Sequence, residues 1–137
     1  MSDLSDLYQE VILDHNRRPR NWGAIDGADR QARGHNPLCG DRVTIEIRLD
    51  EQGRIAELAH KVRGCALCEA SAAALTPRAI GHTATQVAEL RREIDSVLTG
   101  ESQGTGDFAA FAPVAEHKSR RDCVTLPFEA LRAALAG

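Results

Sequence analysis

The sequence is short of aromatic residues and has no long apolar run. One tryptophan, one tyrosine and three phenylalanines occur among 137 residues, so the aromatic platforms that stack single-stranded nucleic acid are not expected. The formal charge of −3 is close to balance and does not predict a surface for nucleic acid or lipid. The longest apolar stretches are far too short to span a bilayer. We therefore expect a protein that works without nucleic acid and without a membrane.

The first residues lack the basic and then apolar pattern of a secretory signal, because Ser2, Asp3, Ser5 and Asp6 stand there. We expect a cytoplasmic protein, in which thiols are kept reduced. Its four cysteines are then ligands or nucleophiles rather than disulfide partners. A chain of 137 residues with 42% hydrophobic and 27% charged residues predicts one globular domain over residues 1–137.

Three cysteines and one aspartate are the most informative residues of the chain. Cys39, Asp41, Cys65 and Cys123 supply three thiolates and a carboxylate from three separated segments, which is enough to close a tetrahedral metal site. Thiolates favour zinc or an iron–sulfur cluster over magnesium or calcium. Zinc accepts sulfur and carboxylate together, and a cluster usually has four thiolates but tolerates other ligands. The pattern of ligands therefore allows either zinc or an iron–sulfur cluster at this site.

The segments that carry these four residues are basic. Cations beside a thiol lower its pKa, and they offset the negative charge that four anionic donors leave around a divalent ion. For the short run from 118 to 121, a solvated charged segment without a further role is an equally good interpretation. The flanking cations are Arg42, Lys61, Arg63, Lys118, Arg120 and Arg121.

The fourth cysteine complicates the ligand set. Cys65 and Cys68 form a C-x-x-C pattern at the start of an expected helix, where the helix N-terminus stabilises a thiolate. Cys68 is therefore a redox partner, an alternative ligand or a small buried residue, and we favour burial. His35 and His60 lie close to the cysteines in sequence and are kept as reserve ligands.

Periodicity predicts a hairpin. Val43, Ile45, Ile47 and Leu49 alternate with polar residues, which is typical of a half-buried strand. Residues 50–53 indicate a turn, and residues 54–63 the returning strand. A third strand is allowed within residues 22–38, which show no clear pattern. Because the hairpin is antiparallel, the segments before its first strand and after its second become neighbours, which brings Cys39 and Cys65 together.

Helical patterns precede and follow the hairpin. An amphipathic first helix is predicted around residues 4–12, and an alanine-rich helix over 69–75, which Pro77 should kink, end or restart. Thr83 and Gln86 predict a capping box for a helix that Gly100 closes. A short helix after Asp107 and a last helix capped by Thr125 complete the pattern. This order predicts an α+β fold with an antiparallel sheet.

The residues around the cysteines resemble the iron–sulfur cluster assembly family of IscU, SufU and the N-terminal part of NifU. The resemblance covers almost the whole chain, and its motifs are DHNRRPRN at residues 14–21, NPLCGD at 36–41, GC at 64–65 and CVTLP at 123–127. The long interval between the second and third ligand cysteines is similar to that of the SufU branch. The resemblance implies a small α+β domain with a three-stranded antiparallel sheet and a metal site at one end.

The resemblance also implies ligands and partners. SufU-like proteins hold zinc with three cysteines and an aspartate, which correspond here to Cys39, Asp41, Cys65 and Cys123. The partner implied is a SufS-like cysteine desulfurase that uses pyridoxal phosphate, followed by the downstream iron–sulfur assembly machinery. SufU-like proteins usually carry a lysine where Asp122 stands, and we expect an acid there to make the neighbouring thiolate harder to form.

The leading hypothesis is a sulfur relay. A thiolate of this protein attacks the terminal sulfur of the desulfurase persulfide, with Cys39 as the acceptor and with Arg120 and Arg121 favouring the anionic persulfide. The protein would then be at most a zinc-dependent sulfurtransferase. Three alternatives remain at this point: a non-enzymatic scaffold for a [2Fe–2S] cluster on the same ligands, a structural zinc-binding interaction module, and a thioredoxin-like oxidoreductase, which the missing strand–helix alternation disfavours.

Overall fold

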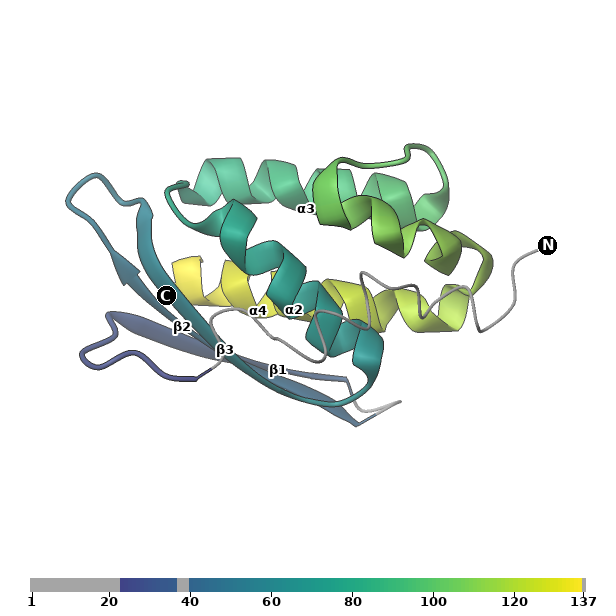
Figure 1. Cartoon of the computed structure of the whole chain (residues 1–137). Coiled ribbons are helices and arrows are strands. Elements are labelled where there is room, and N and C mark those ends of the chain that lie inside the picture. The colour runs from purple at the N-terminus through teal and green to yellow at the C-terminus, as the bar shows by residue number, and fades with distance from the viewer. Residues whose placement is uncertain (1–22, 37–39, 137) are drawn as a thin grey trace.

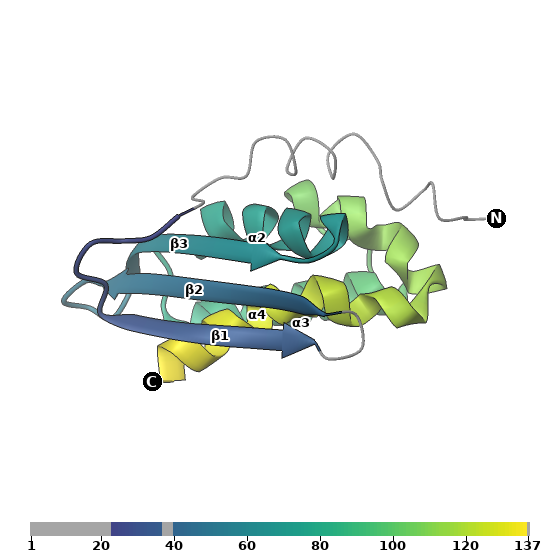
Figure 2. The same cartoon turned by 90° about the horizontal axis from the view of Figure 1, so that it is seen from below.

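Three antiparallel strands form the sheet of the molecule. The computed structural model describes residues 23–36 and 40–136. In it, β1 (Arg30–Asn36), β2 (Asp41–Leu49) and β3 (Ile55–Arg63) lie in the order β1-β2-β3. Both neighbouring pairs are antiparallel, and Figure 2 shows them side by side with the helices behind. The α+β class and the antiparallel sheet expected from the sequence are confirmed.

The hairpin of β2 and β3 forms for the reasons that its sequence indicates. Val43, Ile45 and Ile47 are buried on the side of the helices, while the residues between them point to the opposite face. At the turn, the Asp50 carboxylate accepts hydrogen bonds from the backbone N–H of Gln52 and Arg54, each 2.9 Å long. The predicted hairpin is therefore confirmed.

Strand β1 is built on small residues where it meets a helix. Gly34 pairs with Val43 and therefore shares the helix-facing side of the sheet. A Cβ atom on Gly34 would lie 2.9 Å from Cδ1 of Leu126 and 3.5 Å from Cβ of Ala130. The missing side chain lets the last helix approach this strand closely.

All the described helices lie on one face of the sheet (Figure 1). Helix α2 (Ala66–Ala79) packs on β3, and α4 (Arg121–Ala136) packs on β1 and β2. Helix α3 (Ala84–Thr99) and the 3₁₀ segment η2 (Gly106–Glu116) pack on each other and against α2 and α4, and the short η3 (Lys118–Arg120) leads into α4. Most residues of α2 are buried, and many are alanines, so neighbours approach this helix on most sides.

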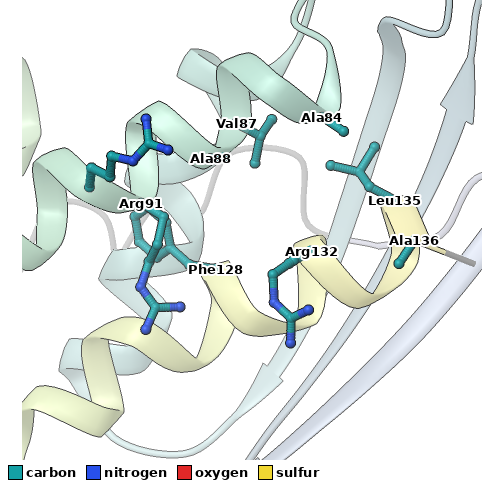
Figure 3. Close-up of a pocket in the computed structure, with 9 residues that line it drawn as sticks. Ala84, Val87, Ala88, Arg91, Phe128, Arg132, Leu135 and Ala136 are labelled. Atoms are coloured by element: carbon teal, nitrogen blue, oxygen red, sulfur yellow. The ribbon is translucent and has the colours of Figure 1, made fainter.

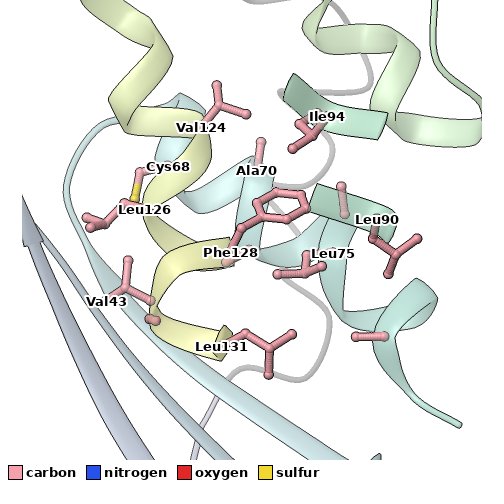
Figure 4. Close-up of a cluster of buried hydrophobic side chains, with 14 of the residues drawn as sticks. Val43, Cys68, Ala70, Leu75, Leu90, Ile94, Val124, Leu126, Phe128 and Leu131 are labelled. Atoms are coloured by element: carbon pink, nitrogen blue, oxygen red, sulfur yellow. The ribbon is translucent and has the colours of Figure 1, made fainter. Parts of the chain in front are cut away.

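The hydrophobic core fills the space between the helices and continues to the sheet. Phe128 lies among residues of three helices, including Leu75 of α2 and Ile94 of α3 (Figure 4). Its ring meets that of Phe108 edge to face, with 5.6 Å between the centroids, a favourable geometry for an aromatic pair. This core is contiguous and reaches the end of the sheet at Val62 and Cys123.

The observed helix boundaries agree in part with those predicted from the sequence. The capping box of Thr83 and Gln86 and the left-handed Gly100 at the end of α3 are both present. Helix α2 continues through Pro77 to Ala79, so the proline lies in its last turn. Helix α4 begins at Arg121 rather than after Thr125, which corrects the predicted start. The predicted helix at residues 4–12 lies outside the described residues.

No helix in the described part of the chain is long and apolar enough to cross a membrane.

Candidate metal centre

Three predicted ligands meet at one end of the sheet. Asp41 is the first residue of β2, Cys65 follows β3 and immediately precedes α2, and Cys123 lies in the first turn of α4. One ligand atom from each lies within 4.8 Å of the others. Antiparallel pairing of β2 with β3 brings the first two together, and the packing of α4 on the sheet brings the third. Cys39, the fourth predicted ligand, lies outside the described residues.

Asp41 is held in place by the backbone around it. The residue is 1% exposed, and Oδ1 of its carboxylate accepts a hydrogen bond of 2.9 Å from the backbone N–H of Cys65. Oδ2 lies 3.7 Å from the Cys65 sulfur. A Cβ atom on Gly64 would lie only 2.1 Å from Oδ1, so the carboxylate occupies the space that a side chain at position 64 would need.

Cys65 is half-buried, and its thiol is activated. Its pKa is lowered to about 7, chiefly by the hydrogen bond that the Cys123 thiol donates to its sulfur. The backbone amides of Cys68 and Leu67 at the start of α2 lower it as well, whereas burial and the charge of Asp41 raise it. A thiol at a helix N-terminus is stabilised as thiolate, so Cys65 is the more readily ionised of the two thiols in this cluster.

Cys123 keeps its proton when Cys65 ionises. Its pKa is raised by its hydrogen bond to Cys65, by burial and by the charge of Asp41. Asp122, which was predicted from the sequence to disfavour this thiolate, is exposed. It is not among the causes that raise the pKa of Cys123. The acid that opposes ionisation of Cys123 is therefore Asp41, the neighbouring ligand, and binding of a cation between them would displace the shared proton.

The arginines that precede Cys123 lie where a helix begins. Arg120 ends η3 and Arg121 begins α4, and cations there oppose the positive end of the helix dipole. The presence of these two arginines is therefore not explained by a stabilising effect on the helix. The Nε atom of Arg121 is buried and makes no hydrogen bond within the described part of the chain.

Cys68 and the two reserve histidines stand apart from the cluster. Cys68 is fully buried in α2, as favoured for this residue, and is not one of the clustered ligands. His60 is buried at the position opposite Ile45, and His35 is exposed near the end of β1. Neither histidine belongs to the one ligand cluster found in residues 23–36 and 40–136.

A separate groove lies between α3 and α4 (Figure 3). It encloses about 360 Å³ and is floored by apolar side chains such as Val87, Phe128 and Leu135. Three arginines, Arg91, Arg92 and Arg132, also line it, but no cysteine or acid does. The groove therefore lacks the groups that the sulfur or metal chemistry of the cluster requires.

The donor set of the cluster fits a thiophilic metal. Sulfur and carboxylate oxygen together suit zinc and are compatible with an iron–sulfur cluster. A buried carboxylate beside a thiol of lowered pKa concentrates negative charge, which is costly in a protein interior unless a cation balances it. Asp41, Cys65 and Cys123 are thus suited to hold such a metal.

Comparison with known proteins gives a consistent result. The family model described as the NifU-like N terminal domain matches residues 7–136. The zinc-dependent sulfurtransferase SufU of Bacillus subtilis is 31% identical, covering 98% of this chain and 93% of the relative. The iron–sulfur cluster assembly scaffold protein IscU of Streptococcus pyogenes is 30% identical, covering 98% and 86%.

Solved structures agree with these matches. A NifU-like N-terminal protein from Brucella abortus has a TM-score of 0.87 and 28% identity, covering 97% of this chain and 94% of that one. A structure described as a putative scaffold protein for the SUF system, from Fervidobacterium islandicum, has the same TM-score and 26% identity, covering 97% and 99%. The three-stranded fold expected from the resemblance is confirmed.

Proposed function

The chain belongs to the NifU-like N-terminal domain family of iron–sulfur cluster assembly proteins, and from that premise we propose that it is a zinc-containing acceptor and relay of persulfide sulfur. The observation that carries the proposal is the cluster of Asp41, Cys65 and Cys123, whose ligand atoms lie within 4.8 Å of one another. The similarity to a relative named as a zinc-dependent sulfurtransferase supports zinc as the metal.

We assign Cys39, Asp41, Cys65 and Cys123 as the zinc ligands. Bound zinc would keep the ligand cysteines as thiolates and shield them from oxidation. Asp41 is already fixed by the Cys65 amide, so the carboxylate donor is preorganised. Cys68 is buried outside the set and has a packing role in this proposal.

Cys39 is the proposed acceptor of sulfur. Its thiolate attacks the terminal sulfur of the donor's cysteine persulfide. A sulfur–sulfur bond forms to Cys39, the donor's sulfur–sulfur bond breaks, and the donor cysteine leaves as a thiolate while the transferred sulfur keeps the negative charge of the persulfide. No external oxidant or reductant is needed. Arg120 and Arg121 favour the approach of the anionic persulfide.

The proposed donor is a SufS-like cysteine desulfurase that uses pyridoxal phosphate, and the sulfur then passes to downstream iron–sulfur assembly machinery. We place the reaction in the cytoplasm, where thiols are kept reduced. The protein would thus act as a sulfurtransferase only together with the desulfurase.

Metal analysis of the protein purified under anaerobic conditions tests the zinc site. We expect one zinc per chain without acid-labile sulfide. Alkylation read by mass spectrometry should show that zinc protects Cys39, Cys65 and Cys123, and that a chelator exposes them. In a sulfur-uptake assay, Cys39→Ala should accept no sulfur, and Cys68→Ala is the matched control that should accept it normally. Full uptake by Cys39→Ala would overturn the assignment of the acceptor.

A scaffold for a [2Fe–2S] cluster is the second candidate. The similarity to a protein named as a cluster assembly scaffold favours it, and the same four residues would be the ligands. Anaerobic reconstitution with stoichiometric iron and sulfide tests it. A brown protein with equal iron and acid-labile sulfide would support the scaffold, and a colourless product would exclude it.

A further inference from the structure

We infer that the outer face of the sheet, at the end that carries the metal centre, is a docking surface for an acidic patch on the sulfur donor. This inference rests on the proposed function, because the donor is the protein that delivers sulfur to the centre. The surface, here called the basic face, is a cluster of exposed cationic side chains and one histidine. Its residues are Arg33, His35, Arg42, Lys61 and Arg63.

The strand register places these residues in two rows. His35, Arg42 and Arg63 are cross-strand partners, and the next row contains Arg33, Thr44 and Lys61. These side chains point away from the helices, because the intervening residues of β2 and β3 at this end are buried in the core. The same residues line a shallow hollow of about 450 Å³ on this face. A partner would therefore meet all five groups on one surface.

The arrangement is not one that stabilises a sheet. Arg42 stands directly opposite Arg63, and like charges in that position destabilise a strand pair. Farther along the same face, Arg48 stands opposite Glu57 and forms an ion pair of 2.7 Å. Cross-strand charges are thus balanced at the far end of the sheet and uniformly positive at the end near the metal centre.

In the described part of the chain, the cations of the basic face also have no acidic partners. Arg33, Arg42, Lys61 and Arg63 make no ion pair or side-chain hydrogen bond within residues 23–36 and 40–136. Elsewhere, arginines such as Arg78, Arg91 and Arg132 are bound by glutamate or aspartate. No acidic side chain of residues 23–36 and 40–136 thus competes for these cations with an acidic surface of another protein.

The position of the basic face suits the donor in particular. Arg42 is adjacent in sequence to Asp41, and Arg63 lies two residues before Cys65. A donor that transfers a sulfur atom covalently must cover this end of the molecule, so its surface comes to lie near these cations. Complementary charge would speed the encounter and set its orientation.

Binding of the zinc-loaded full-length chain to the cysteine desulfurase of the same organism tests the inference. Arg33→Glu with Lys61→Glu should weaken the affinity at least about tenfold, mainly by slowing association, and should reduce its dependence on salt. Neither residue is a ligand, so zinc content should not change. Desulfurase turnover at saturating concentrations of the variant should equal that with the unmodified protein.

Controls separate a local from a general effect of charge. Lys61→Glu alone is compared with Arg92→Glu, which makes the same kind of charge reversal at an exposed position of α3 with no ion pair among the described residues and should leave the affinity unchanged. Thermal melting of each variant checks the fold. If charge reversal unfolds the sheet, Arg33→Gln with Lys61→Gln replaces it, with a smaller expected loss of affinity.

The outcomes distinguish this inference from the proposed function. Unchanged desulfurase affinity in the folded variants, or no desulfurase binding by the unmodified protein, would overturn the docking surface. Salt-sensitive binding that the variants lose, without any sulfur uptake by the unmodified protein, would support the surface and refute the sulfur relay. Selective loss of affinity for a single-stranded RNA oligonucleotide, with desulfurase binding intact, would overturn the assignment to an acidic protein.

Discussion

At the residue scale, the position of Asp41 depends on the absence of a side chain at residue 64. The Asp41 carboxylate accepts the Cys65 amide hydrogen and fills the place of a Cβ atom on Gly64. Ligand atoms that are fixed by neighbouring groups bind metal more tightly, and loss of such a neighbour typically costs 10- to 100-fold in affinity. Gly64 is therefore part of the centre although it contributes no ligand.

Gly64→Ala should weaken zinc binding by at least about tenfold, because the new Cβ must displace the carboxylate. Competition with a chromophoric chelator measures the change. Gly53→Ala is the control: Gly53 has positive φ but open space around it, so this change should reduce stability without reducing zinc affinity. Equal zinc affinity of Gly64→Ala and the unmodified protein would contradict the role given to Gly64.

Cys68 and Cys123 are both buried, but only Cys123 lies in the ligand cluster, so position and not burial separates a packing thiol from a candidate ligand. Cys68→Ala removes a fully buried sulfur and should lower the free energy of unfolding by about 1–2 kcal/mol, while zinc remains at one per chain. Chemical denaturation and metal analysis measure the two effects. Cys65→Ala should show the opposite pattern, with zinc lost. Loss of zinc in Cys68→Ala would make Cys68 a ligand.

At the scale of elements, an ion pair joins α2 to α3. Arg78 forms two hydrogen bonds of 2.9 and 2.8 Å with Glu93, and its guanidinium lies 4.2 Å from the centre of the Phe108 ring. Glu93 also accepts hydrogen bonds from the backbone and hydroxyl of Thr105. This carboxylate therefore ties two helices to the segment that leads into η2.

Glu93→Gln should lower the free energy of unfolding at neutral pH by about 1–2 kcal/mol. The pKa of Glu93 is lowered to about 2 by Arg78 and Thr105, so the unfolded chain binds its proton first as the pH falls. The stabilising contribution is complete above the ordinary pKa of 4.5 and disappears as the pH falls from there towards 2. Denaturation of both proteins across this range measures the convergence.

Glu89→Gln is the control for this change, because Glu89 is an exposed residue of the same helix. Its stability should follow that of the unmodified protein at every pH. A stability difference for Glu93→Gln that persists undiminished at low pH would mean that the carboxylate charge is not the stabilising group.

The elements that the sequence predicted well are those with a clear repeating pattern. The hairpin follows from large alternating side chains, and α3 from its capping box and closing glycine. Strand β1 has Ala32 and Gly34 on its inner side, since α4 packs closely there, so it shows no hydrophobic alternation. For that reason its outward Arg33 was not singled out from the sequence, and His35 was considered only as a reserve ligand.

The start of α4 could not be predicted from local signals. Thr125 before Pro127 is typical of a helix beginning, yet the helix begins at Arg121. The proline is accommodated inside the helix, where Ser71 of α2 donates a hydrogen bond to the Val124 carbonyl. This contact ties the first turn of α4, which contains Cys123, to α2. The candidate ligands could be predicted from the sequence, but the position of Cys123 beside Asp41 and Cys65 depends on long-range packing of α4.

At the scale of the whole molecule, the ligand cluster lies at one margin of the hydrophobic core, which Cys123 joins and against which Cys65 packs. The largest fully buried side chains, including Phe108, Phe111 and Leu131, come from η2, the helices and the sheet and do not depend on a metal. The core thus accounts for the fold, whereas the cluster at the end of the sheet is available for chemistry.

Removal of zinc by a chelator should therefore lower the melting temperature without unfolding the chain. Zinc bound only to the folded state adds stability by mass action, but the core remains without it. Far-ultraviolet circular dichroism before and after chelation measures the helical content, and restored zinc should restore the melting temperature. Complete loss of helical signal on chelation would favour a structural zinc module instead.

The most direct test of the account is the mass of the Cys39 peptide after reaction with the desulfurase. Zinc-loaded protein is incubated under anaerobic conditions with the cysteine desulfurase and L-cysteine, alkylated, and digested. We predict that the peptide gains one sulfur atom only when the enzyme and cysteine are both present, and that Cys68→Ala gains it equally. Absence of added sulfur on every cysteine, with an active desulfurase in the mixture, would contradict the sulfur relay.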